Sequence, residues 1–349
     1  MLRKLNKACV CGHFGFGENL LNGQTVKTKI IMEELKRRLG KDKVMELDTH
    51  GGKKKLFSLP FSLFNALKKC ENIIILPAQN GIRVIAPLLV LENKIFKRKL
   101  QYVVIGGWLP EFLKNRFTLA KQLKKFDNIY VETNAMKKAL ISQGFANVEV
   151  MPNCKQIKIL NEDELIYANA EPYRLCTFSR VMKEKGIEDA INAVREINDK
   201  YGRNVFSLDI YGQVDAGQTI WFDELTASFP DYVKYGGVVP FDKSTDVLKE
   251  YYALLFPTYY DGEGFAGTLI DAMAAGVPIV ASDWKYNGEI VKNNETGILY
   301  PVNNKDELVD KLIYCYENPK MWADMKCKCV KEAKEYTPET VIDILINRL

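Results

Sequence analysis

The chain has 349 residues, of which 47% are hydrophobic and 27% are charged. This composition is typical of a folded globular protein and, with no biased tract, argues against disordered and fibrous classes. The length exceeds that of one ordinary hydrophobic core and favours two domains.

The net charge of +5 is unevenly distributed along the chain. Residues 1–160 contain 29 Lys and Arg against 12 Asp and Glu, a net charge of +17, whereas the remainder contains 20 against 32, a net charge of −12. A strongly basic half suggests a nucleic acid, an anionic membrane or an acidic small molecule such as a pyrophosphate as its partner.

The eight cysteines include no C-x-x-C pair, and several lie in apolar runs, which fits a reducing cytoplasm. Cys9, Cys11 and His13 do not have a recognised zinc spacing, and alternate residues of one strand explain them more simply than a metal site. The first residues lack the apolar stretch of a signal peptide, and no segment is long enough to span a membrane. We therefore expect a cytoplasmic location.

Short apolar runs alternate with helical patterns, an order typical of parallel α/β sheets. In the first half the predicted strands are residues 8–12, 43–47, 72–76, 102–105, 128–131 and 147–151, with helices such as 26–39 and 136–143. After a polar connector the predicted strands are 175–178, 206–210, 233–235, 254–256, 278–281 and 298–300, followed by helices 306–317 and 319–336.

This alternation predicts two doubly wound, Rossmann-like domains that face a central cleft. We place the first domain at residues 1–160 and the second at residues 161–335. The last segment, 336–349, is predicted to be a C-terminal helix that packs back on the first domain.

The segment 256–283 reads as strand, loop, helix and strand, and it has the composition of an anion site beside carboxylates. Gly264 and Gly267 allow backbone N–H groups to approach a ligand, and the helix N-terminus favours a phosphate. Glu263 and Asp271 can face the same cleft, where a carboxylate accepts hydrogen bonds from the vicinal hydroxyls of a sugar or ribose. Taken singly, each would be an ordinary helix N-terminal acid or solvated helix residue.

The run from Glu263 to Asp271 resembles the E-x7-E motif of retaining glycosyltransferases with the GT-B fold, with Asp in place of the second Glu. Arg180 and Lys185-Gly186, which follow a predicted strand, resemble the R-x4-K-G element of the same family. The resemblance covers residues 172–335 and implies a GT-B fold.

By this resemblance, Glu263 contacts the transferred sugar, Asp271 contacts the ribose, and Arg180 and Lys185 neutralise the diphosphate of the donor. Asp in place of the second Glu keeps the negative charge on a side chain that is one methylene shorter. The remaining donor-site residues that the resemblance implies are Gly212, Gly264, Phe265, Ala266, Gly267 and Thr268; a capping role for Thr268 is the alternative.

The resemblance further implies a metal-independent hexosyltransferase that uses a UDP-sugar, or alternatively a GDP-sugar, and no cofactor. The β-phosphate oxygen of the donor would take the acceptor proton in a front-face reaction. The acceptor would be a lipid-linked glycan or an oligosaccharide in bacterial surface polysaccharide assembly, such as capsule or O-antigen. A GT-B phosphorylase or epimerase and a non-catalytic nucleotide-sugar-binding protein remain alternatives, and no nucleic acid is expected.

The first half resembles the family only in its alternation of predicted strands and helices and in the Gly-rich loop at residues 13–25. The histidine that many members carry after a middle strand is absent. The candidate acceptor residues are His13, Gly23, Gln24, Thr25, Gly107, Trp108 and Glu111.

The stretch 53–69 interleaves lysines with Phe57, Phe61 and Phe64, and Pro60 predicts a helix that starts there. One interpretation is a core helix with a solvated basic end. The other is a peripheral contact with the anionic inner face of the cell membrane, to which the basic half contributes.

Overall fold

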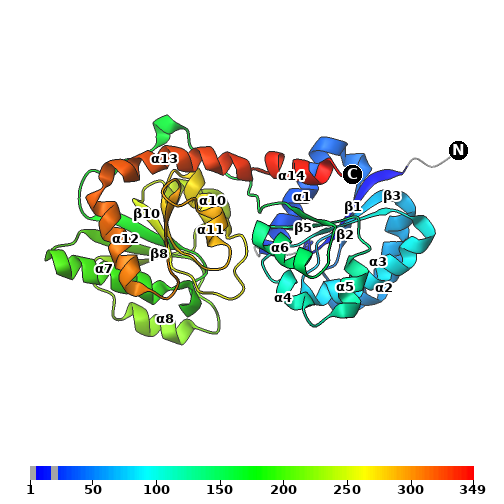
Figure 1. Cartoon of the computed structure of the whole chain (residues 1–349), viewed down its shortest axis with the longest axis horizontal. Coiled ribbons are helices and arrows are strands. Elements are labelled where there is room, and N and C mark those ends of the chain that lie inside the picture. Colours follow the sequence, from blue (N-terminus) through cyan, green and yellow to red (C-terminus); the bar gives the residue numbers. More distant parts are fainter. Residues whose placement is uncertain (1–4, 17–22) are drawn as a thin grey trace. The chain divides into compact units, whose positions relative to one another are not determined.

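The computed structural model describes residues 5–16 and 23–349, and for residues 52–56 it describes the backbone only. The chain separates into two compact units (Figure 1). The N-terminal unit comprises Met1–Gln156 and Thr337–Leu349, and the C-terminal unit comprises Ile157–Tyr336.

The N-terminal unit is built on a six-stranded parallel sheet of order β2-β1-β3-β4-β5-β6. Its strands are β1 (Asn6–Gly12), β2 (Val44–Asp48), β3 (Cys70–Ile75), β4 (Lys99–Val103), β5 (Asn128–Val131) and β6 (Val148–Val150). Its helices are α1 (Gly23–Leu39), α2 (Gly52–Lys69), α3 (Gln79–Phe96), α4 (Leu109–Leu113), α5 (Phe117–Leu123), α6 (Asn134–Ser142) and α14 (Pro338–Ile346). Helices cover both faces of this sheet, with α1 and α14 on one and α2 and α3 on the other (Figure 1).

The central strands of this sheet are apolar runs without alternation, as expected for strands that are covered on both faces. The last five residues of β1 and the last four of β3 are buried. Cys11 of β1 is in register with Leu47 of β2 and Ile75 of β3, so the carboxyl ends of these strands lie at one edge of the sheet. The loops that follow them are therefore brought together.

The C-terminal helix α14 packs against α1, although the two helices lie near opposite ends of the sequence. Val341, Ile342 and Leu345 are buried in the same core cluster as Ile31 and Leu35. An ion pair between Arg38 and Asp343 borders this contact. The hydrophobic burial explains why residues 337–349 belong to the N-terminal unit.

The prediction that a helix starts at Pro60 is wrong, because α2 begins at Gly52 and runs through this proline. Leu63 and Leu67 are fully buried, and Leu59 is 8% exposed. The burial of this apolar face outweighs the cost of a proline inside a helix.

The C-terminal unit contains a second six-stranded parallel sheet, of order β12-β11-β10-β7-β8-β9. Its strands are β7 (Tyr173–Phe178), β8 (Phe206–Tyr211), β9 (Val233–Gly237), β10 (Ala253–Phe256), β11 (Ile279–Ser282) and β12 (Gly297–Tyr300). Its helices are α7 (Ile187–Tyr201), α8 (Thr219–Thr226), α9 (Ser244–Leu248), α10 (Gly267–Ala274), α11 (Asn287–Ile290), α12 (Lys305–Glu317) and α13 (Pro319–Ala333).

The predicted fold class of two doubly wound parallel α/β units is confirmed, and each of the twelve predicted strands overlaps an observed one. Boundaries differ by a few residues; the helix predicted at 319–336, for example, ends at Ala333. Within the described part of the chain, no helix combines the length and the apolar character needed to cross a bilayer.

Candidate functional site

The two sequence motifs of the C-terminal unit meet in a buried ion pair between Lys185 and Glu263. Lys185 Nζ donates to Glu263 Oε2 at 2.5 Å, and the two side chains are only 10% and 8% exposed. The ammonium also lies 5.4 Å from the ring centre of Phe256 and 5.0 Å from that of Tyr260. In this structure the charge of Lys185 is therefore matched by the carboxylate of the second motif.

The backbones of these two segments are also in close contact, near Gly186 in one and Pro257 in the other. Gly186, which caps α7, has a φ of 72°, and a Cβ placed there would lie 2.2 Å from the carbonyl oxygen of Pro257. The N–H of Tyr259 donates to the carbonyl of Glu184 at 2.8 Å. A glycine is needed here both for the left-handed backbone and for the close approach.

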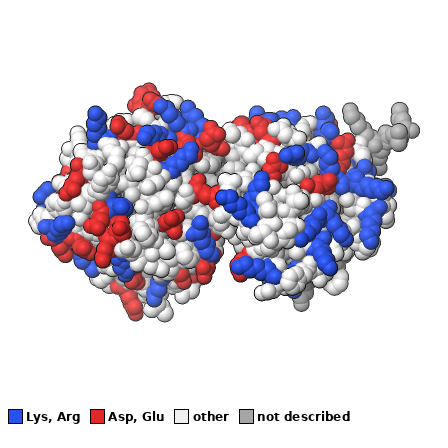
Figure 2. Space-filling model, in the orientation of Figure 1, with Lys and Arg blue, Asp and Glu red and all other residues white. Residues whose placement is uncertain are grey.

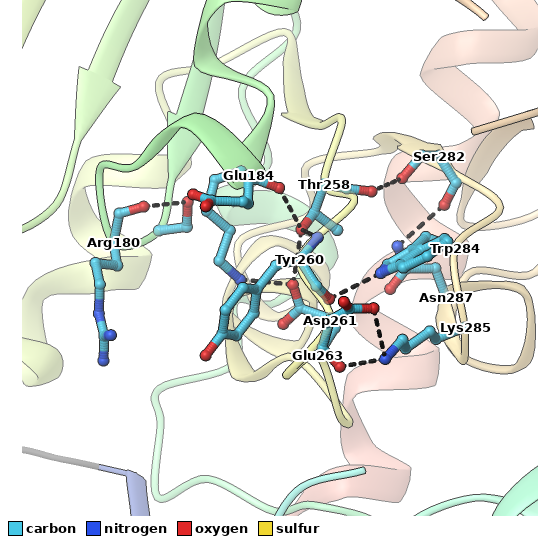
Figure 3. A network of polar contacts seen from close by, with 12 residues as sticks. Arg180, Glu184, Thr258, Tyr260, Asp261, Glu263, Ser282, Trp284, Lys285 and Asn287 are labelled. Atoms are coloured by element: carbon cyan, nitrogen blue, oxygen red, sulfur yellow. Dashed lines mark hydrogen bonds and ion pairs between the residues drawn. The ribbon is translucent and has the colours of Figure 1, made fainter. Parts of the chain in front are cut away.

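Thr258 holds the carboxylate of Glu263 in place (Figure 3). Its Oγ1 lies 2.9 Å from Glu263 Oε2 and is fully buried. The carbonyl of Thr258 in turn accepts a hydrogen bond from Ser282 Oγ, at the end of β11, at 2.5 Å. Glu263 is thus fixed from β10 and β11 as well as from the Lys185 loop.

The start of α10, shortly after Glu263 in the sequence, carries a buried hydroxyl without a partner among the described residues. Gly264 and Gly267 precede and begin the helix, whose cap, Ala266, makes no side-chain hydrogen bond to it. The buried Oγ1 of Thr268 has no hydrogen-bond partner among the described residues. Because a buried hydroxyl without a partner is costly, this geometry favours a ligand at the N-terminus of α10. Phe265, by contrast, is buried against Tyr336, with ring centres 5.1 Å apart.

Asp271 lies inside α10 and is only 3% exposed. Its Oδ1 accepts a hydrogen bond from Ser244 Oγ of α9 at 3.1 Å. The second acid of the motif is therefore already engaged with a neighbouring helix.

Arg180 differs from Lys185 in its surroundings. It is 60% exposed, lies 3.6 Å from Asp215 and extends away from the Glu263 cluster (Figure 3). Gly212, at the end of β8, has a φ of 136°, and a Cβ there would lie 1.7 Å from the carbonyl oxygen of Ser179. Gly212 thus allows the loop that carries Arg180 to lie against β8.

In the N-terminal unit, the predicted acceptor residues His13, Gln24 and Thr25 lie at the carboxyl edge of the sheet. His13 Nδ1 is 2.8 Å from Thr25 Oγ1, and His13 Nε2 is 3.0 Å from His50 Nδ1. Gln24 Nε2 donates to the carbonyl of Leu76 at 3.1 Å. The exposed Gly23 begins α1, whereas residues 17–22 of the predicted Gly-rich loop lie outside the described residues.

Asp48, at the end of β2, orders this histidine pair. Burial acts to raise the pKa of the Asp48 carboxyl, but hydrogen bonds from the backbone N–H groups of His50, Phe14, Phe16 and Gly15 outweigh it and lower the pKa below its usual value. The carboxylate therefore holds the turns after β1 and β2 together. Among the described residues, no three His, Cys, Asp or Glu side chains are grouped to hold a metal.

The other three predicted acceptor residues follow β4. Trp108 Nε1 donates to the carbonyl of Ile105 at 2.8 Å, which closes the turn that contains Gly107. Glu111 is 76% exposed and pairs with Lys114. The side chains of Trp108 and Glu111 are therefore engaged with residues close to them in the sequence.

Several residues that sequence reasoning missed stabilise the two sites. Lys27 of α1 and Glu132, after β5, form an ion pair of 2.6 Å in which both side chains are 3% exposed, and Glu132 also accepts the N–H of Gly106. In the C-terminal unit, Thr258 hydrogen bonds to Glu263, Ser282 hydrogen bonds to the carbonyl of Thr258, and Ser244 hydrogen bonds to Asp271. Glu132 and Thr258 follow a strand and Ser244 begins a helix, but these positions do not distinguish them from other polar residues in the sequence.

Comparison with known proteins assigns the C-terminal unit to a family. Residues 162–335 match the family described as Glycosyl transferases group 1. The chain is 25% identical over 294 residues to the GtfA subunit of a UDP-N-acetylglucosamine–peptide N-acetylglucosaminyltransferase from Streptococcus gordonii, covering 76% of this chain and 54% of that protein. It is 29% identical over 147 residues to the amylovoran biosynthesis glycosyltransferase AmsK of Erwinia amylovora, covering 41% of this chain and 36% of AmsK.

Among solved structures, the fold is similar to that of HepE from Anabaena, crystallised in complex with UDP. The TM-score is 0.74 at 14% sequence identity, with 98% of this chain and 99% of that chain covered. The two parallel sheets thus correspond to a GT-B fold. The chain spans about half the length of the Streptococcus relative.

Proposed function

We propose, since this chain belongs to the group 1 glycosyl transferases, that it transfers a sugar with retention of configuration from a nucleoside diphosphate donor to a glycan acceptor. The observation that carries the proposal is the contact between Lys185 and Glu263, which unites a cation and a carboxylate beside the open N-terminus of α10. A diphosphate and a sugar need these two kinds of group side by side.

The donor is a UDP-sugar in this proposal. HepE, which has a similar fold, was crystallised with UDP and with UDP-glucose, and the Streptococcus relative is named for a UDP-sugar. The donor diphosphate lies at the N-terminus of α10, where the hydroxyl of Thr268 meets it. Asp271 binds the ribose, and Gly212 lets the backbone approach the nucleotide.

The reaction needs charge stabilisation on the leaving diphosphate. Lys185 and Arg180 supply it, without a metal ion or a cofactor, and Arg180 turns inward from its exposed position when the donor binds. Glu263 accepts hydrogen bonds from the transferred sugar. The β-phosphate oxygen of the donor takes the proton of the acceptor hydroxyl on the face that the leaving group vacates.

The acceptor is a lipid-linked glycan or an oligosaccharide of a bacterial surface polysaccharide. The similarity to AmsK, a relative named for amylovoran biosynthesis, supports this choice of acceptor. The acceptor hydroxyl is placed by the N-terminal unit, with His13 and Thr25 as its polar contacts. The protein works in the cytoplasm, at the inner face of the membrane, to which the basic N-terminal unit attaches.

A panel of UDP-, GDP- and ADP-sugars, tested for protection against thermal unfolding, identifies the donor, because a bound ligand raises the unfolding temperature. We expect protection by a UDP-sugar and loss of that protection in Lys185→Met. Release of UDP that depends on an added acceptor then distinguishes transfer from an epimerase. Binding without turnover in the wild type, or full turnover in Glu263→Ala, would refute a catalytic donor site at this position.

A further inference from the structure

The ammonium of Lys185 lies close to two aromatic rings in addition to its contact with Glu263. Phe256, the last residue of β10, and Tyr260, in the loop that follows, have ring centres 5.4 Å and 5.0 Å from Lys185 Nζ. A cation within about 6 Å of a ring centre is attracted to the ring, and the attraction grows when water is excluded. Lys185 is only 10% exposed, so both rings contribute to holding its charge.

The Tyr260 ring is fixed in place by the backbone of its own loop. The carbonyl of Tyr260 accepts a hydrogen bond from Trp284 Nε1 at 2.8 Å (Figure 3) and another from the N–H of Glu263 at 3.1 Å. The N–H of Tyr260 donates to Thr258 Oγ1 at 3.2 Å. A Cβ at Gly262 would lie 2.5 Å from the ring and displace it, so the glycine makes room for the ring.

The aromatic contacts leave hydrogen-bonding capacity on Lys185 for a ligand. An ammonium has three N–H donors. Among the described residues, Lys185 uses one of them, for Glu263. A ring attracts the positive charge through its π-electrons, without supplying an oxygen acceptor of its own at this distance. Two donors can therefore turn to phosphate oxygens while the rings keep the charge in place.

The rest of the C-terminal unit offers a diphosphate little other attraction. Residues 161–349 carry a net charge of −12. In Figure 2 the visible face of this unit carries acidic and basic side chains in a mixture. Arg180, the other cation of the motif, is 60% exposed and lies 3.6 Å from Asp215. The exact position of the Lys185 ammonium therefore matters for the binding of a diphosphate.

We infer that Tyr260 is a positioning residue of the donor site, whose ring holds the Lys185 ammonium at the place where the diphosphate binds. The inference rests on the proposed function, in which Lys185 neutralises that diphosphate. Tyr260 acts through Lys185 and needs no contact with the donor. With the cation held by the rings, the carboxylate of Glu263 can turn to the transferred sugar while the lysine stays in place.

Titration with UDP, followed by ligand-observed NMR so that weak binding is still measured, tests this role. Tyr260→Leu removes the ring and should weaken UDP binding roughly five- to thirtyfold, the range of a desolvated cation–π contact. Tyr260→Phe keeps the ring and should bind UDP as the wild type does. Tyr259→Leu is the matched control, because Tyr259 is the neighbouring, partly buried tyrosine of the same loop, and it should bind UDP normally.

A double-mutant cycle with Lys185→Met separates a positioning role from a general structural one. Once the ammonium is gone, Tyr260→Leu should cause no further loss of UDP affinity, because the ring has no cation left to position. If Lys185→Met does not fold, Lys185→Met combined with Glu263→Gln, which also removes the unpaired carboxylate, replaces it as the background. Additive losses, or Tyr260→Phe binding as weakly as Tyr260→Leu, would overturn the inference.

The same titrations separate this inference from the proposed function. If Lys185→Met binds UDP weakly but Tyr260→Leu binds it as the wild type does, the positioning role is overturned and the donor site stands. If the wild type does not bind UDP, or Lys185→Met binds it equally well, the proposed function is overturned instead.

Discussion

Lys185 and Glu263 lie 78 positions apart in the sequence, yet their side chains are 2.5 Å apart and almost excluded from water. Each charge depends on the other, because an ion that is buried without a partner is strongly destabilising. A donor that carries two phosphates would compete with Glu263 for the ammonium of Lys185. The pair therefore links the stability of the C-terminal unit to the state of its donor site.

Lys185→Met should lower the free energy of unfolding by about 3–5 kcal/mol, because it leaves the Glu263 carboxylate buried without its cation. Adding Glu263→Gln to this variant should restore most of the lost stability. The four proteins of this double-mutant cycle can be compared by urea denaturation. If the two single substitutions simply add, the pair does not interact as the structure indicates.

Thr258→Val should destabilise the protein by about 1–3 kcal/mol, because the valine cannot hydrogen bond to the buried Glu263 carboxylate. Thr177→Val is the matched control, since Thr177 is 2% exposed and its Oγ1 has no hydrogen-bond partner in the described part of the chain. This second variant should be neutral or slightly more stable. Equal effects of both substitutions in urea denaturation would contradict a specific role for Thr258.

Thr268→Val should leave the stability of the ligand-free protein unchanged or slightly raised, because the Thr268 hydroxyl is buried without a partner among the described residues. It should weaken UDP-sugar binding about tenfold if that hydroxyl meets the phosphate. Thr268→Ser, which keeps the hydroxyl, should bind as the wild type does. Calorimetric titration of the three proteins measures the effect, and unchanged affinity in Thr268→Val would place the phosphate elsewhere.

Lys326 of α13 gives the protein a predictable pH dependence. Burial of this side chain, which is 4% exposed, lowers its pKa from 10.5 to about 8. Between pH 8 and 10.5 the unfolded chain binds more protons at this position than the folded one, so this lysine makes stability rise with pH. Lys326→Met should therefore stabilise the protein at pH 7 by about 3 kcal/mol, an advantage that should narrow to about 1 kcal/mol at pH 10.

Denaturant unfolding of both proteins from pH 7 to pH 10 measures this difference directly, and the titration of all other groups cancels in the comparison. A constant difference across this range would mean that Lys326 titrates as an ordinary exposed lysine.

Replacing Phe57, Phe61 and Phe64 by serine should abolish most of the binding to vesicles that contain phosphatidylglycerol, with a loss of at least roughly tenfold in co-sedimentation. The loss of Phe57 and Phe61 should hardly change stability, because these side chains are 82% and 81% exposed. Phe64 is 43% exposed and packs edge-on against Phe96 with ring centres 4.9 Å apart, so its loss should lower stability modestly. Ile220→Ser, at a position that is 77% exposed in the C-terminal unit, is the control and should bind vesicles normally. Wild-type protein that stays in solution would rule out this membrane contact.

The sequence by itself determined the secondary structure and the fold class. Most of the twelve strands were predictable because apolar runs that are buried on both faces of a parallel sheet are local signals, which need no knowledge of distant residues. The edge strand β9, in which only Val233 is buried, is the clearest exception. The loop and helix around Gly264 and Gly267 were likewise predictable from the local sequence pattern. The proline of α2 misled the prediction, because the burial of Leu63 and Leu67 on the sheet is a tertiary effect.

Only the tertiary structure decided which side chains meet. The contacts Lys185–Glu263 and His13–His50 join loops that follow different strands, and their distances depend on strand order and register, which no local pattern encodes. Thr258, Ser244 and Lys27 have no distinctive sequence signal, because a buried polar residue is recognised only by its partner. The two faces of α2 likewise separated only in the folded unit, where one side lines a pocket and the other leaves its phenylalanines in solvent.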